Sequence, residues 1–220
     1  MKPIAESKSR LAPSVSDERR SLLSLGMLAR VLVSAVPSSE IEGPDIEDVV
    51  VYGGDGPVRR ACDRLGAGWR PDPGAGLNGC LQVAFADAAE AGFAYGLFLP
   101  ADLPLATQAE LSAFLKNAGG AHLALAPDLA NDGTNALLID LAVSFPTKLG
   151  EHSFDRHVEQ AQQLDIDCTV YRSEGLGLDI DTASDLERLI ELEPGLWERL
   201  YLELQEAGLD AFLPVGEGAE

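Results

Sequence analysis

The chain has 220 residues, of which 46% are hydrophobic, and a mean hydropathy of +0.03, values typical of one soluble globular domain. Its formal net charge of −20 disfavours binding to nucleic acid or to an anionic membrane, because such polyanions would repel it. No apolar run approaches the roughly 18 residues of a membrane span, and the N-terminus lacks the apolar stretch of a secretory signal, so we expect a cytoplasmic protein.

Helices and strands alternate in the predicted secondary structure. Helices are recognised by an apolar face with the helical period and by capping residues, and strands by short apolar runs that end at glycine or proline. Residues 69–76 are rich in glycine and proline and predict a loop. In chain order we predict a helix over 14–36 capped by Ser14, a strand over 49–52, helices over 57–65 and 77–91, a strand over 95–99, a helix over 107–117, strands over 122–126 and 136–139, a helix over 153–164 capped by Ser153, a strand over 168–171, and helices over 182–192 and from Pro194.

This alternation predicts an α/β fold, a three-layer sandwich with a mostly parallel central sheet and ligands at the carboxyl ends of its strands. We expect one domain over residues 1–208. Residues 209–220 are rich in glycine and glutamate and predict a flexible tail.

Three aspartates follow or form extended segments. In Asp179-Ile180-Asp181 the two carboxylates point to one face of an extended backbone, and Asp102 comes just after a predicted strand. Three carboxylates suit Mg²⁺, which prefers oxygen ligands. The alternative to a metal site is structural. Asp181 could simply flank a helix, and Asp102 could form a turn.

Two short segments offer donors to an anion. The loop 131–135 supplies the Thr134 hydroxyl and backbone N–H groups, and Gly150 and Ser153 stand at the start of a predicted helix. An ordinary turn and simple N-capping by Ser153 explain them as well. Asn78, in a glycine-rich loop, can hydrogen-bond a base or ribose, but a loop role and helix capping explain it as well. The histidines lack metal-ligand spacing, and we assign them no catalytic role.

The first ten residues hold a cluster of cations. Lys2, Lys8 and Arg10 lie there, whereas lysine occurs again only at positions 116 and 148. A solvated tail is one interpretation of this cluster. A segment that neutralises an anionic ligand is the other.

Taken together in this order, several segments resemble the 2-phospho-L-lactate guanylyltransferase family. Each is weakly specific alone, and the set spans residue 2 to about residue 186. The segments are Lys2-Pro3, Lys8-Ser9-Arg10-Leu11-Ala12-Pro13, Gly76-Leu77-Asn78, Leu99-Pro100-Ala101-Asp102-Leu103-Pro104-Leu105, Asp132-Gly133-Thr134-Asn135, Ser153-Phe154-Asp155-Arg156-His157 and Leu178-Asp179-Ile180-Asp181-Thr182.

The resemblance implies a fold of the nucleotide-diphospho-sugar transferase type and a step in making the deazaflavin coenzyme. In that step GTP and a phosphorylated three-carbon acid, which is 2-phospho-L-lactate, phosphoenolpyruvate or 3-phosphoglycerate, give a guanosine diphospho-linked product and pyrophosphate. By similarity, Asp102, Asp179 and Asp181 bind Mg²⁺, while Lys8 and Arg10 neutralise the triphosphate.

The resemblance also implies residues for the acid. By similarity, Lys2, Thr134, Gly150 and Ser153 bind its carboxylate and phosphate. The sequence leaves open which acid is used, whether GTP is preferred to ATP, and the oligomeric state, for which a homodimer is one expectation.

The chain departs from the family pattern in one respect. Family members open with an apolar strand before the lysine that aligns with Lys2, and here that first strand is missing. We therefore expect a natural start about 8 residues upstream, a typical strand length.

Two alternatives to guanylyl transfer remain. The chain could be another nucleotidyltransferase of the same fold or a noncatalytic nucleotide-binding descendant.

Overall fold

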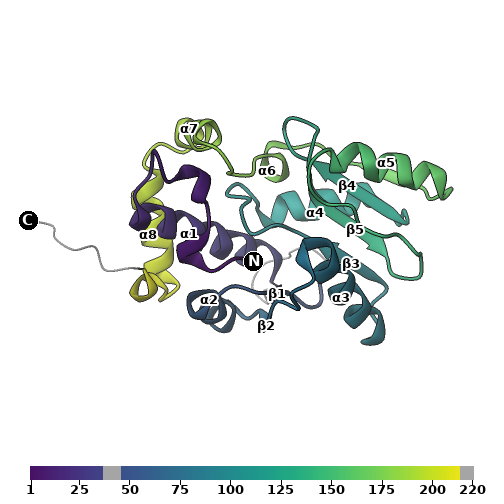
Figure 1. The fold of residues 1–220 in the computed structure, drawn as a ribbon, viewed down its shortest axis with the longest axis horizontal. Coiled ribbons are helices and arrows are strands. Elements are labelled where there is room, and N and C mark those ends of the chain that lie inside the picture. Colours follow the sequence, from purple (N-terminus) through teal and green to yellow (C-terminus); the bar gives the residue numbers. More distant parts are fainter. Residues whose placement is uncertain (37–45, 214–220) are drawn as a thin grey trace, which may run out of the picture.

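A computed structural model describes residues 1–36 and 46–213, and every predicted helix and strand has a counterpart in it (Figure 1). The helices are α1 (Asp17–Ala35), α2 (Gly56–Leu65), α3 (Gly76–Glu90), α4 (Gln108–Ala118), α5 (Ser153–Gln163), α6 (Glu174–Gly177), α7 (Ala183–Leu192) and α8 (Leu196–Glu206). The strands are β1 (Val50–Tyr52), β2 (Gly68–Arg70), β3 (Tyr95–Phe98), β4 (Leu123–Pro127), β5 (Thr134–Asp140) and β6 (Cys168–Val170). The 3-10 helices are η1 (Ile4–Glu6), η2 (Ser9–Leu11) and η3 (Asp210–Phe212).

The larger sheet has four strands in the order β3-β5-β4-β6. β4 and β6 pair in parallel, whereas β5 runs antiparallel to both of its neighbours. β3, β4 and β6 therefore point the same way, which agrees with a mostly parallel sheet. β5 is reversed because only residues 128–133 separate it from β4, and a parallel partner would need a much longer crossover.

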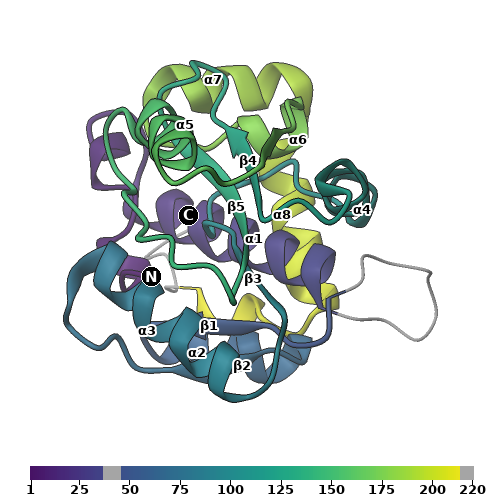
Figure 2. The ribbon, with the colours of Figure 1, turned by 90° about the vertical axis from the view of Figure 1, so that its right-hand side faces the viewer.

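Helices cover both faces of this sheet. Successive side chains of a strand point to opposite faces, so Ala124 of β4 packs in one core cluster with Phe114 of α4. Leu125, the next residue, packs in another cluster with Phe154 of α5. Figure 2 shows α4 and α5 on opposite sides of β4. The predicted three-layer sandwich is confirmed.

A second, two-stranded sheet pairs β1 with β2 in parallel, and α2 forms the crossover between them. The predicted loop over 69–76 is wrong at its start, where β2 lies. The strand is held by its partners: the Trp69 indole N–H donates to the Gly53 carbonyl at 2.8 Å, and the Arg59 guanidinium stacks 5.3 Å from the Trp69 ring centroid. Glycine and proline around a three-residue strand hide it from pattern analysis.

Met1 lies beside the end of β1. Its amino group donates to the Tyr52 carbonyl, and the Gly54 N–H donates to the Met1 carbonyl at 2.7 Å. In the described part of the chain, the β1-β2 pair is a separate sheet from the four-stranded one. The first strand expected before Lys2 stays a prediction.

The C-terminal boundary differs from the expectation. Leu209, placed in the predicted flexible tail, is fully buried and packs with Leu204 and Val58. The chain turns at Gly208 (φ 67°), and the Leu209 N–H donates to the Leu204 carbonyl at 2.7 Å, a common way to end a helix with a glycine. The tail prediction is therefore wrong for residues 209–213. Residues 214–220 lie outside the described part of the chain.

The long helix α1 packs against η1 and α8. Its N-cap is Ser16, whose side chain accepts from the Arg19 N–H at 3.4 Å, and the predicted cap at Ser14 is wrong by two residues. Ser14 instead belongs to the turn after η2, where its N–H donates to the Leu11 carbonyl. Across residues 1–36 and 46–213, no helix is both long and apolar enough to cross a bilayer.

Candidate active site

The segment that carries Lys8 is folded onto α1. Lys8 lies between η1 and η2 with a left-handed backbone (φ 51°). The Ser7 hydroxyl donates to the Ile4 carbonyl at 2.7 Å, and the Arg20 guanidinium of α1 donates to the Ser7 carbonyl at 3.0 Å. The buried Ile4 and Leu11 anchor the two ends of the segment. The interpretation as a solvated tail is wrong for residues 4–11, and Lys8 has a defined direction.

Lys8 bridges two of the predicted metal ligands. Its Nζ lies 2.5 Å from Asp102 Oδ2 and 3.3 Å from Asp181 Oδ1, and its side chain is only 9% exposed. The exposed Arg10 reaches Asp181 Oδ2 at 3.3 Å. The Ile180 N–H donates to the Asp102 carbonyl at 3.3 Å, which keeps the loop after β3 beside the 178–181 segment. The structure thus brings Lys8, Arg10, Asp102 and Asp181 together.

Asp179 lies on the same side of its segment as Asp181, because Ile180 between them is buried in the core. The Asn135 amide donates to Asp179 Oδ1 at 3.2 Å. Burial, together with the negative charges of Asp102 and Asp181, raises the pKa of the Asp179 carboxyl to about 6, against the opposing effect of the hydrogen bond from Asn135. The ionised Asp179 carboxylate therefore lacks enough nearby positive charge to offset its burial and its acidic neighbours.

This donor set fits a hard divalent cation in its chemistry. Carboxylate oxygens are the ligands that Mg²⁺ prefers, and an additional cation would offset the charge that raises the pKa of Asp179. Within the described residues, no three acidic, histidine or cysteine side chains are already arranged around one metal position. Instead, the Lys8 ammonium forms ion pairs with one carboxylate oxygen each of Asp102 and Asp181.

Strand β5 connects the aspartates to a second group of predicted site residues. Thr134 and Asn135 are adjacent, so their side chains point to opposite faces of the strand. Thr134 Oγ1 lies 3.0 Å from Nδ1 of the buried His157, while Asn135 reaches Asp179. Sequence reasoning missed both Asn135 and His157. The alternation after Thr134 was the available signal for Asn135.

The start of α5 differs from the expectation. Its N-cap is His152, with a left-handed backbone (φ 54°), so the predicted cap at Ser153 is wrong. Ser153 is 1% exposed, and its N–H donates to the Gly150 carbonyl at 3.1 Å. The Asp132 carboxylate accepts from the His152 N–H at 3.1 Å, a bond that lowers the pKa of Asp132. A carboxylate of the chain itself thus uses the His152 N–H, next to the expected anion-binding residues Gly150 and Ser153.

Asn78 and Lys2 are placed differently from the rest. The Asn78 amide donates to the Leu149 carbonyl at 3.1 Å and accepts from the Leu149 N–H at 2.7 Å, so it holds the loop before Gly150. Lys2 is exposed beside the end of β1. Among the described residues, no ion pair joins Lys2 to the three aspartates.

Comparison with known families identifies the chain. Residues 1–204 match the family described as guanylyl transferase CofC like. The chain belongs to this family. Because the match covers nearly the whole chain, every site residue described above lies inside the guanylyl transferase region.

Named relatives in this guanylyl transferase family differ in the acid. The chain is 35% identical to the phosphoenolpyruvate guanylyltransferase of Rubrobacter xylanophilus, over 86% of this chain and 90% of that protein. It is 31% identical to the 2-phospho-L-lactate guanylyltransferase of Methanothermobacter thermautotrophicus, over 89% and 83%. It is 32% identical to the 3-phospho-D-glycerate guanylyltransferase of Phenylobacterium zucineum, over 81% of each.

Solved structures support the fold type of this guanylyl transferase chain. A crystal structure named for a nucleotide-diphospho-sugar transferase of Desulfovibrio desulfuricans G20 superposes with a TM-score of 0.72 and 15% identity, over 98% of this chain and 96% of that one. A cytidylyltransferase of Leptospira borgpetersenii superposes with a TM-score of 0.51 and 14% identity, over 100% and 96%. The predicted nucleotide-diphospho-sugar transferase fold is confirmed.

Proposed function

We propose that the chain transfers the guanylyl group of GTP to a small phosphorylated three-carbon acid, with release of pyrophosphate, as a step toward the deazaflavin coenzyme. Family membership supports guanylyl transfer. The names of its relatives supply the acceptor class, since phosphoenolpyruvate, 2-phospho-L-lactate and 3-phospho-D-glycerate each carry a phosphate and a carboxylate on three carbons.

The observation that carries the proposal is the meeting of Lys8 with Asp102 and Asp181. These three residues come from segments far apart in the sequence, and the positive charge of Lys8 lies between the negative charges of Asp102 and Asp181. A transfer between phosphates needs both signs, since cations bind the phosphates and carboxylates hold a metal ion. A plain surface ion pair would not need a lysine whose side chain is 9% exposed.

In the proposed reaction, an oxygen of the acid's phosphate forms a bond to the α-phosphorus of GTP. The bond from that phosphorus to the oxygen bridging to the β-phosphate breaks, and pyrophosphate leaves with the electron pair. The attacking phosphate is already ionised at neutral pH, so no general base is required. Catalysis therefore depends on orientation and electrostatic stabilisation.

We assign Mg²⁺ to Asp102, Asp179 and Asp181. When bound, the ion supplies positive charge that offsets the negative charge of the phosphates during transfer. Asn135 orients Asp179 through its amide, and Lys8 and Arg10 add positive charge beside Asp102 and Asp181. These residues hold the aspartates in place before GTP arrives, which lowers the cost of organising the site.

We assign the acid to Thr134, Gly150 and Ser153, with Lys2 adding a positive charge. The Thr134 hydroxyl and the backbone of the loop before α5 offer neutral donors, which suit a carboxylate or phosphate. Asn78 contributes by holding Leu149, next to Gly150. The base or ribose contact expected for Asn78 stays a prediction.

The test incubates the purified protein with Mg²⁺, GTP and each of the three acids, and identifies the nucleotide product by mass spectrometry. We expect one acid to give a guanosine diphospho-linked product with an equal amount of pyrophosphate, and chelation of the metal to stop it. Reactions with ATP and CTP distinguish another nucleotidyltransferase of this fold. Pyrophosphate release without any acid, or no product with all three acids, would contradict the proposal.

A further inference from the structure

The His157 imidazole is fully buried between two parts of the proposed acid site. It projects from the first turns of α5, and its Nδ1 lies 3.0 Å from Thr134 Oγ1 at the start of β5. On the other side of the ring, the backbone N–H of Lys148 donates to Nε2 at 2.8 Å. One ring therefore joins β5 to the loop that leads to Gly150.

These two contacts determine which ring nitrogen carries the proton. A backbone N–H can only donate, so Nε2 of His157 is the acceptor and the proton of the neutral ring is on Nδ1. Nδ1 then donates to Thr134 Oγ1, and the hydrogen of the Thr134 hydroxyl remains available. A hydroxyl held in this way is a donor, which is what a carboxylate or phosphate oxygen needs.

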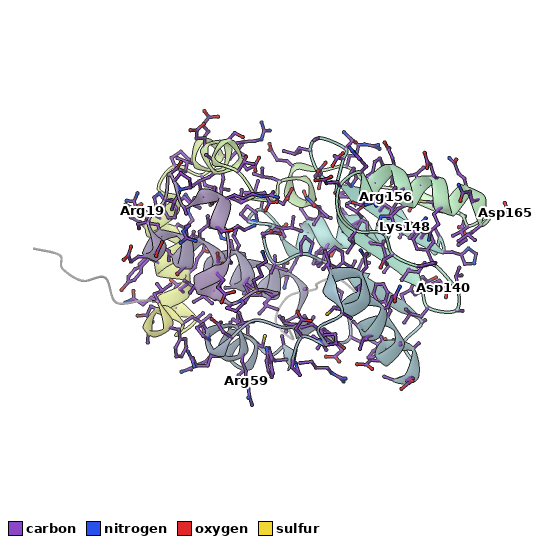
Figure 3. All side chains as sticks on the ribbon, in the orientation of Figure 1. Arg19, Arg59, Asp140, Lys148, Arg156 and Asp165 are labelled. Carbon is purple, nitrogen blue, oxygen red and sulfur yellow. The ribbon has the colours of Figure 1, made fainter. Side chains whose placement is uncertain are left out.

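The His157 ring is neutral near pH 7. Burial, together with the positive charges of Arg156 and Lys148, lowers the pKa of His157 to about 4. In Figure 3, Arg156 lies on α5 and Lys148 lies next to this helix. A protonated ring would carry a hydrogen on Nε2 facing the Lys148 N–H. The neutral ring keeps both contacts.

The loop before Gly150 is held at two successive residues. His157 accepts from the N–H of Lys148, and the Asn78 amide pairs with both backbone groups of Leu149. Gly150 has a backbone conformation (φ 119°) that other residues rarely adopt, so its peptide groups can point in a direction that other residues do not allow. The contacts to Lys148 and Leu149 fix the orientation of these peptide groups.

We propose that His157 is a positioning residue for the phosphorylated acid, which sets the Thr134 hydroxyl as a donor and fixes the backbone from Lys148 to Gly150. The inference rests on the proposed function, because it assumes that Thr134 and Gly150 bind the acid. His157 itself stays buried and does not touch the substrate.

The test compares KM for the acid with KM for GTP in His157 variants. His157→Phe keeps a ring but removes both contacts, and we expect KM for the acid to rise about tenfold to a hundredfold while KM for GTP changes less than about twofold. His157→Asn places an amide near the Nδ1 position and should recover part of the loss. The control is His122→Phe, since the His122 ring is exposed before β4 and pairs with Asp167. It should leave both KM values unchanged.

A double-mutant cycle tests whether His157 acts through Thr134. Thr134→Val should itself raise KM for the acid, and adding His157→Phe to it should raise KM by no more than about threefold. A merely structural histidine would give independent effects. Full additivity, or equal rises in KM for the acid and GTP, would overturn the proposal.

Folding is checked by circular dichroism. If His157→Phe does not fold, the ratio of KM values is measured in His157→Asn and His157→Gln, which keep the contact to Thr134 or to Lys148 respectively. In both variants KM for the acid should rise more than KM for GTP, because each variant loses one of the two contacts, and an unchanged ratio in both overturns the proposal. If the wild type is active and the His157 variants keep its KM for the acid, this inference is overturned and the proposed function is not. A wild type that uses none of the three acids defeats both it and the proposed function.

Discussion

Replacing Asp179 by asparagine should stabilise the metal-free protein while abolishing guanylyl transfer. The pKa of Asp179 is raised from 3.8 to about 6, so its ionised form is disfavoured in the folded state. At roughly 1.4 kcal/mol per pKa unit the rise corresponds to about 3 kcal/mol, and because Asp179 is only partly buried, solvent screening reduces this to about 1–2 kcal/mol. The amide oxygen of asparagine can still accept from Asn135.

The gain should depend on pH with a defined sign. A carboxyl whose pKa is raised in the folded state costs no stability below its unfolded pKa of 3.8 and costs the full amount above about 6. Relative to the wild type, Asp179→Asn should therefore show its full gain at pH 7.5 and about half of it at pH 5. Comparing the two proteins at each pH cancels the other titrating groups.

The assay is urea unfolding followed by circular dichroism, with a chelator present, at both pH values. Asp167→Asn is the control, because hydrogen bonds from His122 lower the pKa of Asp167 and its replacement should give no gain. Adding Mg²⁺ should stabilise the wild type and not Asp179→Asn. A variant less stable than the wild type at pH 7.5, a gain that grows at pH 5, or retained transfer would refute the reasoning.

Three further substitutions test the site and the fold. Lys8→Met should lower kcat by at least about a hundredfold, because it removes the cation between Asp102 and Asp181, while replacement of the exposed Lys116 should have no effect in the same assay. Asn135→Ala should raise the Mg²⁺ concentration for half-maximal activity by about tenfold, and an unchanged midpoint would contradict its role. Leu209→Asp should lower the free energy of unfolding by about 3 kcal/mol in urea titrations, against less than about 0.5 kcal/mol for the same change at Leu202, which is 54% exposed.

Local signals were sufficient to predict most of the fold. Thr107 accepts from the Glu110 N–H, and Thr182 forms a capping box with Asp185, so α4 and α7 begin where their sequences indicate. β2 was missed because long-range pairing with β1 holds it. Leu209 was assigned to a tail because glycine-rich composition says nothing about which apolar residue a preceding helix can bury.

The site was only partly predictable. The spacing of Asp179 and Asp181 determines that their carboxylates share a side, but only the family resemblance placed Asp102 beside them. The direction of Lys8 depends on Arg20, a contact between segments that no local pattern encodes. Likewise, nothing in the sequence shows that both amide atoms of Asn78 bind the backbone of Leu149, 71 residues away.

Crystals grown with GTP and Mn²⁺ in place of Mg²⁺ would test most directly whether the three aspartates share a cation. Anomalous scattering locates the manganese independently of any assumption about its ligands. We predict a peak about 2 Å from carboxylate oxygens of Asp102, Asp179 and Asp181, with Lys8 facing the phosphates of GTP. Manganese bound to GTP away from these side chains, or to other residues of the chain, would contradict the account.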